Sequence, residues 1–527
     1  MIGYEDWSVA GWRTHLPGVA DVRAFAASLG EETIPALAAA AAERVPGRVA
    51  VTVDGEPVTH AELDDEAGRV AAWLAQRVRP GDRVLLAAGA SLGFVRCYLG
   101  ALRAGAVVVL ANPGYTTAEL GHLVTDSGAV LAFADREPAR RLAGLGPRDP
   151  GEPRNPGEPG ELVTVDVRER PGRTGAAPAI VARPHDTALL AYTSGTTGRP
   201  KGVPLTHRQL AVSIRAAMAA WRWHADDVLV HALPLYHQHG LGGVHATLIA
   251  GGTVHVRSKF SAADLVQAAG DTRASVLFGV PTIYQALLEW PAALAGGLAG
   301  LRLAVCGSAP LSPALASRAP AVLGRLPLVR YGTTESGLNV SNPLGGARGD
   351  TIGVPLPGVR ARIRAADGLA DHGVDGEIQL RGPHVFSGYW NDPAATSAAF
   401  TPDGWFRTGD IGAVDPATGH LAIRGRTKEM IITGGLNVYP REVEIALEGH
   451  PSVAEAAVAG VADERWGERV TAWVVLRGGH GFDEAALIAH ARTRLAGYKC
   501  PKRIFQLAEL PRNQLGKVVR SGLRERG

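Results

Sequence analysis

The segment that decides the fold reads Tyr192-Thr-Ser-Gly-Thr-Thr-Gly-Arg-Pro-Lys-Gly202. It follows an apolar run, Thr187–Ala191, that predicts a buried strand, and it precedes a helix expected to begin near Thr206. Glycines let a backbone curl closely around an anion, the hydroxyl side chains add donors, and Lys201 adds a positive charge. A plain glycine-rich turn is the alternative, but it would not need four hydroxyl residues and a lysine. The segment therefore predicts a loop that binds the triphosphate of ATP.

This loop differs from the Walker phosphate-binding pattern, because its spacing is different and Gly202 follows Lys201 where a serine or threonine would stand. The surrounding chain alternates between expected helices and apolar strands, which predicts a largely parallel sheet with covering helices. The expected elements are helices at Ala61–Val78 and Phe94–Ala104, and strands at Arg83–Ala87, Ala106–Leu110, Ser275–Phe278, Leu301–Val305 and Leu328–Tyr331.

The chain has 527 residues, which is too long for one ordinary domain. After Ile352 short strands such as Gly376–Arg381 and Leu421–Arg424 predominate, and a segment from Lys428 onward has helices and strands of its own. We predict an α/β fold with a large N-terminal domain, residues 1–427, of mostly parallel sheets, covering helices and a β-rich subdomain. A small α+β domain, residues 428–527, follows. Residues 144–179, where Pro-Gly-Glu-Pro occurs twice, are predicted to be a flexible insertion.

The composition favours a soluble protein of a reducing compartment. A net charge of +3 gives no electrostatic reason to expect nucleic acid or a membrane surface as a partner. Cys97, Cys306 and Cys500 are too far apart for a metal motif or a disulfide framework. The N-terminus lacks the pattern of a signal peptide, and the apolar runs are too short to span a bilayer. We therefore expect a cytoplasmic location.

Four further segments carry chemistry, and each follows the loop in sequence. They are Tyr331-Gly-Thr-Thr-Glu335, Gly404-Trp-Phe-Arg-Thr-Gly-Asp410, Gly425-Arg-Thr-Lys-Glu429 and Pro511-Arg-Asn-Gln-Leu-Gly-Lys517. Together with the loop they resemble, in order, the signatures of the adenylate-forming superfamily of acyl-CoA synthetases, adenylation domains and luciferases. The resemblance extends from about residue 33 to residue 520.

The resemblance implies an ATP-dependent carboxylic acid–CoA ligase that forms an acyl-adenylate, releases pyrophosphate and then AMP, and uses Mg²⁺. Tyr331 could stack on adenine, while Asp410 is suited to accept hydrogen bonds from the ribose hydroxyls. Arg426 offers planar donors to ribose or phosphate. The nucleotide-binding residues implied are Thr193, Ser194, Gly195, Thr196, Thr197, Gly198, Lys201, Gly307, Ser308, Ala309, Pro310, Tyr331, Gly332, Thr333, Thr334, Asp410, Arg426 and Lys517.

The implied catalytic residues are Lys517, Glu335, Thr193, Lys201 and His237, with Thr197 and Glu335 as the metal ligands. Lys517 would bridge the acid's carboxylate and the nucleotide, where an anion attacks an anionic phosphate. Lys428 marks the expected hinge of a mobile C-terminal domain that turns between adenylation and thiolation. Gly434 and Gly435 would then line the path of the CoA pantetheine, although a simple glycine turn is as good an explanation of that pair.

The acid pocket is expected between Leu233–Gly240 and Leu301–Pro310. Within the superfamily the chain is most similar to malonyl-CoA synthetases, over the stretches Trp223–Leu241, Phe278–Tyr284, Val305–Pro310, Arg330–Tyr331, Ser341–Pro343 and Ile432–Pro440. A second carboxylate needs a fixed cation, since burying it unpaired is costly. Arg330 is the candidate, with Ser308, Gly332, His237 and His239 beside it.

Alternatives remain open at several of these positions. Arg330 could instead brace the nucleotide loop, and His237 could gate the acid channel without contacting the acid. Thr333 stands where malonyl-CoA synthetases usually have methionine, so an aryl acid, a fatty acid or nitrite is an alternative substrate. The acceptor could be a carrier protein or an amine in place of CoA, and a non-catalytic nucleotide-binding protein is the rival from another class. The oligomeric state is left open.

Overall fold

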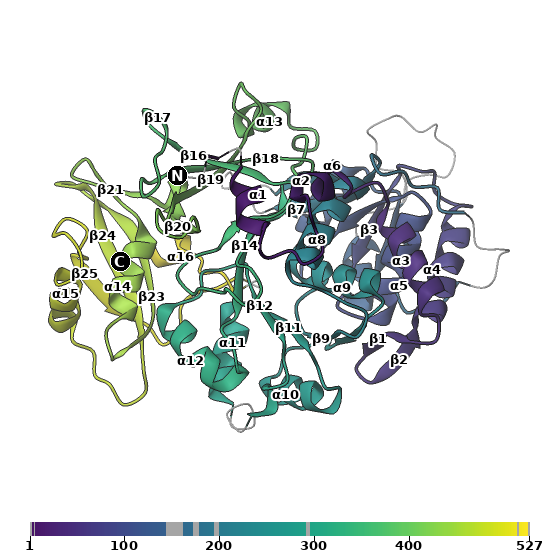
Figure 1. Cartoon of the computed structure of the whole chain (residues 1–527), viewed down its shortest axis with the longest axis horizontal. Coiled ribbons are helices and arrows are strands. Elements are labelled where there is room, and N and C mark those ends of the chain that lie inside the picture. The colour runs from purple at the N-terminus through teal and green to yellow at the C-terminus, as the bar shows by residue number, and fades with distance from the viewer. Residues whose placement is uncertain are drawn as a thin grey trace.

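The computed structural model describes residues 3–4, 6–143, 162–171, 179–193, 200–290, 296–513 and 516–524. Figure 1 shows a large body, coloured purple to green, beside a smaller C-terminal part in yellow-green. Four sheets organise the described chain: one of nine strands, one of six and two of five. This arrangement confirms the predicted α/β class, with mostly parallel sheets in the N-terminal part.

The six-stranded sheet carries the loop 192–202 between its last two strands. Its order is β6-β5-β3-β4-β7-β8, and all neighbouring strands are parallel except the β7–β8 pair. The bounds are β3 (Arg83–Ala87), β4 (Val107–Leu110), β5 (Leu131–Ala134), β6 (Val163–Asp166), β7 (Thr187–Thr193) and β8 (Lys201–Thr206). The strand predicted at Arg83–Ala87 is confirmed residue for residue.

Strand β6 corrects one expectation about the segment 144–179. Val163–Asp166 pairs in parallel with β5, and the following Val167 is fully buried. The proline- and glycine-rich composition around the repeated Pro-Gly-Glu-Pro predicts flexible chain, but the alternating Val-Thr-Val-Asp run forms an edge strand. Residues 144–161 and 172–178 lie outside the described chain, so the prediction of a flexible insertion stays untested there.

The nine-stranded sheet has the order β15-β14-β13-β12-β11-β9-β10-β1-β2. The inner strands β13, β12, β11, β9, β10 and β1 pair in parallel. Strand β2 at one end of the sheet, and β14 and β15 at the other, add antiparallel pairs. The bounds are β1 (Val49–Val53), β2 (Glu56–Thr59), β9 (Val228–His231), β10 (Thr253–Val256), β11 (Val276–Gly279), β12 (Leu303–Cys306), β13 (Leu328–Thr333), β14 (Gly337–Ser341) and β15 (Val354–Pro355).

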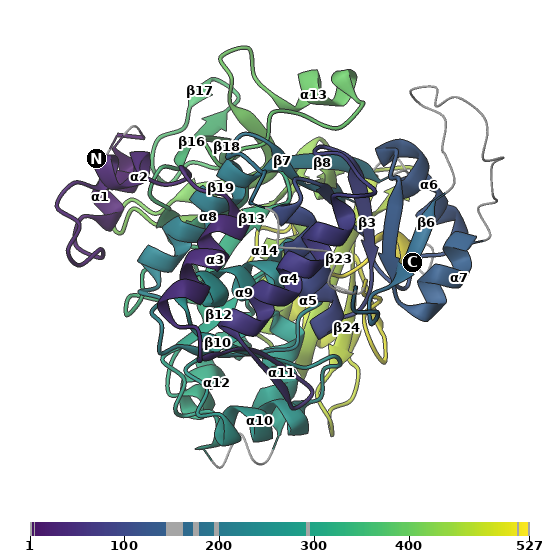
Figure 2. The same cartoon turned by 90° about the vertical axis from the view of Figure 1, so that its right-hand side faces the viewer.

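Helices fill the space between these two sheets and cover their outer faces, as Figure 2 shows. Helix α5 contacts β3 and β4 of one sheet and β1 of the other, and α8 contacts β7, β8 and β14. The inner helices are α3 (Ile34–Arg44), α4 (His60–Leu74), α5 (Leu92–Arg103), α8 (His207–Ala220) and α9 (Gln238–Ala250). The remaining N-terminal helices are α1 (Trp7–Trp12), α2 (Val22–Ala27), α6 (Thr117–Ser127), α7 (Arg136–Ala143), α10 (Ala262–Asp271), α11 (Pro281–Glu289) and α12 (Pro313–Leu323).

Local sequence explains where the helix after the loop begins. Thr206 accepts a hydrogen bond from the Gln209 amide, and the Gln209 side chain accepts one from the Thr206 amide. This reciprocal capping box satisfies two amide groups that a helix start would leave without partners. The prediction of a helix near Thr206 is therefore confirmed.

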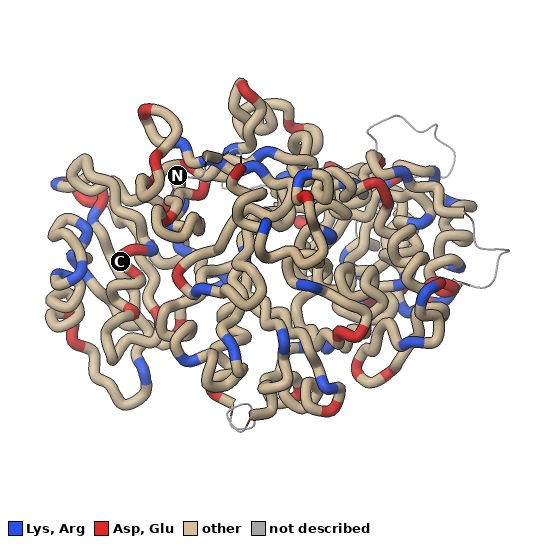
Figure 3. Tube along the Cα trace, viewed as in Figure 1, with Lys and Arg blue, Asp and Glu red and all other residues tan. Residues whose placement is uncertain are grey.

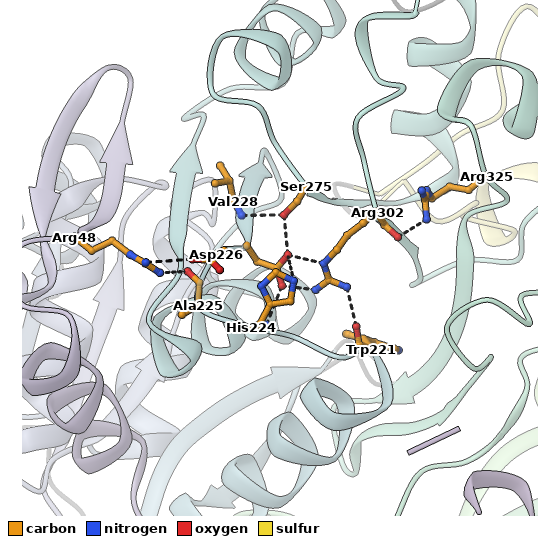
Figure 4. Close-up of polar contacts among 10 residues, drawn as sticks. Arg48, Trp221, His224, Ala225, Asp226, Val228, Ser275, Arg302 and Arg325 are labelled. Carbon is orange, nitrogen blue, oxygen red and sulfur yellow. Dashed lines mark hydrogen bonds and ion pairs between the residues drawn. The ribbon is translucent and has the colours of Figure 1, made fainter. Parts of the chain in front are cut away.

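A buried ion pair ties together the amino ends of three parallel strands, β9, β11 and β12. Asp227 is fully buried and receives hydrogen bonds from Arg302 Nε at 2.6 Å, from Ser275 Oγ at 2.7 Å and from the His224 amide at 3.0 Å. Arg302 also donates to the carbonyl of Trp221 at 3.0 Å. Figure 4 shows Arg302 reaching between Ser275 and Trp221. We name this set of contacts the Asp227 anchor.

A five-stranded antiparallel sheet follows, with the order β17-β16-β18-β19-β20. Its elements are β16 (Arg360–Ala365), β17 (Gly368–Leu369), β18 (Gly376–Arg381), α13 (Pro393–Ala399), β19 (Phe406–Val414) and β20 (Leu421–Arg426). The strand predicted at Gly376–Arg381 is confirmed, and β20 extends the predicted strand by two residues, to Arg426.

The C-terminal part has its own five-stranded sheet and its own core. Val443, Leu447, Val458 and Val474 are completely buried in a cluster separate from the N-terminal cores. The elements are η2 (Thr427–Glu429), β21 (Ile431–Thr433), β22 (Leu436–Val438), α14 (Pro440–Glu448), β23 (Val453–Asp463), β24 (Gly467–Leu476), α15 (Glu484–Arg492), β25 (Arg503–Gln506) and α16 (Ser521–Arg524).

Figure 3 shows that lysines and arginines alternate with aspartates and glutamates along the chain trace. None of the helices in the described ranges combines the length and the apolar character needed to cross a membrane.

Candidate active site

The candidate site lies where the parallel strands end. Strands β7 and β8 pair at Thr193 and Lys201, so these two residues stand at the mouth of the loop. The predicted phosphate-binding residues Ser194, Gly195, Thr196, Thr197 and Gly198 lie outside the described chain. The neighbouring Tyr192 donates a hydrogen bond to Asp126 Oδ2 at 2.6 Å, which fixes the base of the loop against helix α6.

The segment Tyr331–Glu335 leaves the end of β13 and turns into β14. Thr333 Oγ1 lies 2.8 Å from Ser336 Oγ, and the Thr334 carbonyl accepts a hydrogen bond from Gln238 at 3.0 Å. Gly332 is required for close packing, since a Cβ there would come within 2.2 Å of the Gly337 carbonyl oxygen. The turn is therefore held on both sides by contacts within the protein.

Asp410 joins this turn to the antiparallel sheet. The Tyr331 hydroxyl donates to Asp410 Oδ2 at 2.6 Å, and Arg426 Nε lies 2.8 Å from Asp410 Oδ1. The carboxylate of Asp410 is 3% exposed, whereas the Arg426 side chain is 54% exposed and open to a ligand. The nearby Asp410 charge raises the pKa of Arg426. Each carboxylate oxygen keeps a free lone pair for a further donor.

Glu335 is held by residues that follow β18. Its Oε1 accepts a hydrogen bond from the Tyr389 hydroxyl at 3.0 Å, and its carbonyl accepts one from the Phe386 amide at 2.8 Å. Lys201 Nζ lies 3.9 Å from Asp392 Oδ2 and 5.1 Å from the centre of the Tyr389 ring. Sequence reasoning had passed over Tyr389 and Asp392, because a tyrosine and an aspartate before Pro393 look like an ordinary turn.

Lys517 reaches the site from the C-terminal part. It follows a tight turn in which the Asn513 amide donates to the Lys517 carbonyl at 2.8 Å, and Gly516 has φ +72°. A Cβ on Gly516 would lie 3.0 Å from Thr282 Oγ1 of helix α11, so the turn docks against the N-terminal part. Burial lowers the pKa of Lys517, helped by the positive charges of Arg426 and Arg330 and opposed by Asp410 and Glu335. The described pose thus brings Lys517 together with the predicted nucleotide-binding residues.

The predicted acid-pocket residues also meet. His239 Nδ1 lies 3.0 Å from Ser308 Oγ, and the His239 ring packs on Phe278 at 5.6 Å between centroids. Ser308 has φ +67°, a left-handed conformation that costs a non-glycine residue on the order of 1–3 kcal/mol and often marks a functional site. Ala309 and Pro310 continue this turn after β12.

Arg330 Nε is buried and has no hydrogen-bond partner among the residues that the structure describes, and the same holds for His239 Nε2. A Cβ on Gly307 would lie 2.6 Å from Arg330 Nε, so the glycine makes room for the guanidinium. Burial lowers the pKa of Arg330 to about 10, partly opposed by Cys306. Burial, and then the charge of Lys517, lower the pKa of His237 to about 4, so this imidazole is neutral at ordinary pH.

Three predicted residues stand apart from this cluster. Lys428 is exposed in η2, at the junction between the antiparallel sheet and the C-terminal part. Gly434 and Gly435, with φ +58° and +80°, form the two-residue turn between β21 and β22. A Cβ on Gly434 would meet only the Trp466 ring within 4 Å, and one on Gly435 would meet nothing. Their roles in a second pose remain predictions.

A magnesium site can be judged by its donors. Across the described ranges no group of three or more histidine, cysteine or carboxylate side chains could hold a metal ion by itself. Mg²⁺ that arrives with nucleotide phosphates needs only one or two protein carboxylates, because water and phosphate oxygens complete its coordination. Glu335, with one oxygen fixed by Tyr389, fits that requirement.

Comparison with known proteins agrees with this geometry. A family described as "AMP-binding enzyme" matches residues 38–390, and one described as "AMP-binding enzyme C-terminal domain" matches residues 442–517. A feruloyl-CoA synthase of Amycolatopsis is 37% identical over 494 residues, covering 91% of this chain and 96% of that protein. The mitochondrial malonate–CoA ligase of Mus musculus is 38% identical over 375 residues, which is 64% of either chain. The ATP-bound crystal structure of MatB from Rhodopseudomonas palustris has a TM-score of 0.84 at 36% identity, covering 94% of this chain and 99% of that one.

The chain belongs to the family of AMP-binding enzymes, the adenylate-forming superfamily. It is an AMP-forming acid–thiol ligase, and ligases of this kind use ATP, Mg²⁺ and CoA. The resemblance of its sequence to that superfamily is confirmed.

Proposed function

We propose that this ligase activates a short dicarboxylic acid, with malonate as the leading candidate, and transfers the acyl group to CoA. The observation that carries the proposal is Arg330. This residue places a cation within β13, and its buried Nε has no partner among the described residues. A buried guanidinium of this kind is costly without an anion, and its planar donors match a carboxylate.

The neighbours of Arg330 support a carboxylate as the occupant. Ser308 Oγ and His239 Nε2 add a hydroxyl and a ring nitrogen to the same part of the pocket, and the nitrogen is buried without a described partner. Burial, and then Arg330, lower the pKa of His239, so the ring is neutral and can donate one N–H. The relative named for malonate supports the same acid, while the relative named for ferulate makes an aryl acid the alternative.

The site residues divide the adenylation step among them. Asp410 and Arg426 would hold the ribose, Lys201 and the loop would hold the β- and γ-phosphates, and Glu335 would hold Mg²⁺. Bound Mg²⁺ would neutralise phosphate charge during the displacement. One carboxylate oxygen of the acid attacks the α-phosphorus, the bond to the bridging oxygen breaks, and pyrophosphate leaves. Lys517 stabilises the negative charge between the two anions as they approach.

Thioester formation follows at the same carboxyl carbon. The CoA thiolate attacks the acyl-adenylate, the carbon–oxygen bond to AMP breaks, and AMP leaves with the electron pair. We propose that the C-terminal part turns about Lys428 between the two steps, which withdraws Lys517 and admits Gly434 and Gly435. The tight docking of the Gly516 turn on Thr282 supports the described pose as the one for adenylation.

The proposal is tested by measuring AMP and pyrophosphate release with Mg-ATP over a panel of acids, each with and without CoA. The panel comprises malonate, methylmalonate, acetate, a medium-chain acid, ferulate and nitrite. We expect malonate to give the highest kcat/KM, with AMP release that depends on CoA. Turnover confined to ferulate or another acid would overturn the diacid assignment, and AMP release without CoA would overturn the acceptor.

A further inference from the structure

The segment 386–392, between β18 and α13, contacts two parts of the site that come from distant regions of the chain. On one side it holds Glu335 twice, through the Phe386 amide on the Glu335 carbonyl at 2.8 Å and through the Tyr389 hydroxyl on Oε1 at 3.0 Å. The first contact fixes the main chain and the second orients the carboxylate. A carboxylate with one oxygen occupied presents the other to a ligand.

On its other side the same segment holds the start of β8. Lys201 Nζ lies 5.1 Å from the centre of the Tyr389 ring and 3.9 Å from Asp392 Oδ2. The Trp390 amide donates to the Gly202 carbonyl at 2.8 Å. A single aromatic side chain thus touches the two residues that would hold the metal ion and the phosphates.

Tyr389 itself is firmly placed. Its amide donates to Thr396 Oγ1 at 2.9 Å, and the Phe386 ring meets its ring edge-on at 4.9 Å between centroids. Burial, and then the negative charges of Glu335 and Asp392, raise the pKa of Tyr389, so its hydroxyl keeps its proton. The group is therefore a fixed donor to Glu335 and a fixed ring beneath Lys201.

We propose that Tyr389 is a positioning residue for adenylation: its hydroxyl orients the Glu335 carboxylate toward Mg²⁺, while its ring holds the Lys201 ammonium beside the phosphates. The inference rests on the roles proposed above for Glu335 and Lys201. Its added content is that one side chain sets the position of the metal ligand relative to the phosphate ligand. Mg²⁺ and ATP would then bind to a carboxylate, Glu335, and an ammonium group, Lys201, whose relative positions are already fixed.

Two substitutions separate the two halves of this role. Tyr389→Phe removes the hydroxyl but keeps the ring, so the donor to Glu335 is lost and the cation–π contact with Lys201 stays. Loss of a partner that orients a metal ligand typically weakens metal binding by about 10-fold or more. Tyr389→Leu removes the ring as well, so the placement of Lys201 is also lost.

The experiment is a calorimetric titration of ATP, in the absence of acid, at a series of Mg²⁺ concentrations and in EDTA. For Tyr389→Phe we expect a rise of about 10-fold in the Mg²⁺ concentration that gives half of the maximal gain in ATP affinity. The Kd of ATP in EDTA should stay unchanged. For Tyr389→Leu the Kd in EDTA should also rise. Tyr4→Phe is the matched control, because it removes a hydroxyl that donates to the Ala370 carbonyl at 2.8 Å, in the N-terminal segment.

Glu335→Gln separates failure of the inference from failure of the role given to Glu335. If Glu335→Gln leaves the Mg²⁺ dependence of ATP binding unchanged, the role given to Glu335 is wrong. If Glu335→Gln changes this dependence and Tyr389→Phe does not, only the inference about Tyr389 is wrong. When both single variants shift it, the double variant should match Glu335→Gln alone, because the two groups act through one contact.

A further variant at the same position tests the inference independently of Tyr389→Phe. Tyr389→His is the second variant, since it keeps a ring and an N–H donor; recovery of part of the Mg²⁺ dependence relative to Tyr389→Leu supports the inference. A Tyr389→His variant that binds Mg-ATP no better than Tyr389→Leu would overturn it.

Discussion

Arg426 Nε lies 2.8 Å from Asp410 Oδ1, directly across the β19–β20 pair in which the two residues are register partners. The pairing of two strands thus fixes the pairing of two charges at the nucleotide site. Asp410 is almost completely buried, whereas Arg426 is more than half exposed. A ligand that bonds to Asp410 would therefore find the Arg426 guanidinium beside it.

Asp410→Asn should raise the KM for ATP by about 10-fold or more, because a charged acceptor at the ribose is lost. The kcat for adenylation should change much less, since the reacting groups are untouched. Initial rates of pyrophosphate release over a range of ATP concentrations measure both quantities. Asp403→Asn is the control, because Asp403 pairs with Arg362 on the exposed side of the same sheet; an equal rise in KM there would contradict the role of Asp410.

Lys517→Ala should slow adenylation by about 10²–10³-fold, because a single stabilising donor in a closed site contributes about that much. Thioester formation from a pre-made acyl-adenylate and CoA should continue at nearly the native rate. The two half-reactions are measured separately by pyrophosphate release and by thioester yield. Lys259→Ala, at an exposed lysine, is the control. Equal loss of both half-reactions would show that Lys517 has another role.

Arg330→Met should lower kcat/KM for malonate by at least about 30-fold, the effect of removing one partner from a buried charge pair. Activity with acetate should fall much less or rise, because the substituted pocket no longer contains an unpaired cation. The acid panel on the variant gives the comparison. A parallel fall for both acids would favour the alternative in which Arg330 braces the nucleotide loop.

Asp227→Asn should lower the free energy of unfolding at pH 7 by about 3 kcal/mol, because it leaves Arg302 without its buried partner. Burial alone would raise the pKa of Asp227, but the contacts with Arg302, His224 and Ser275 hold it below its usual value. A lowered folded-state pKa contributes stability above the unfolded value of about 3.9, and this contribution is lost as pH falls through the folded value. Urea unfolding of both proteins at pH 7, 5 and 3.5 should therefore show a difference that narrows only below about pH 4.

Two kinds of signal in the sequence pointed to the candidate site. Thr193 ends β7, an apolar strand that is visible in the sequence because both of its faces are buried. Lys201, the first residue of β8, and Asp410, within β19, were identified by residue type and spacing. The strands around them were placed to within a few residues, and the α/β class followed from their alternation with helices. The short edge strand β6 was missed, because a proline- and glycine-rich composition on both sides of it concealed four strand residues.

The partners of those residues could not be predicted in the same way. Tyr389 and Glu335 are 54 positions apart, and no local pattern marks which tyrosine will face which carboxylate. The unpartnered state of Arg330 Nε is likewise a result of three-dimensional packing, since it depends on Gly307 of a neighbouring strand end. Residue type and spacing identify the groups that do chemistry, whereas their orientation depends on contacts made only in the folded chain.

The Asp227 anchor lies at the amino ends of β9, β11 and β12, whereas the proposed acid pocket lies toward the opposite ends of the strands, where Ser308 follows β12 and Arg330 lies within β13. The amino ends of these strands therefore hold the buried ion pair, and the proposed determinants of acid selectivity lie toward the other ends. For protein engineering this separation means that the turns around Ser308 and Thr333 can be exchanged to admit other acids while the strands that carry them stay anchored. A library confined to those turns should retain the fold in most members and vary chiefly in the acid that each member activates.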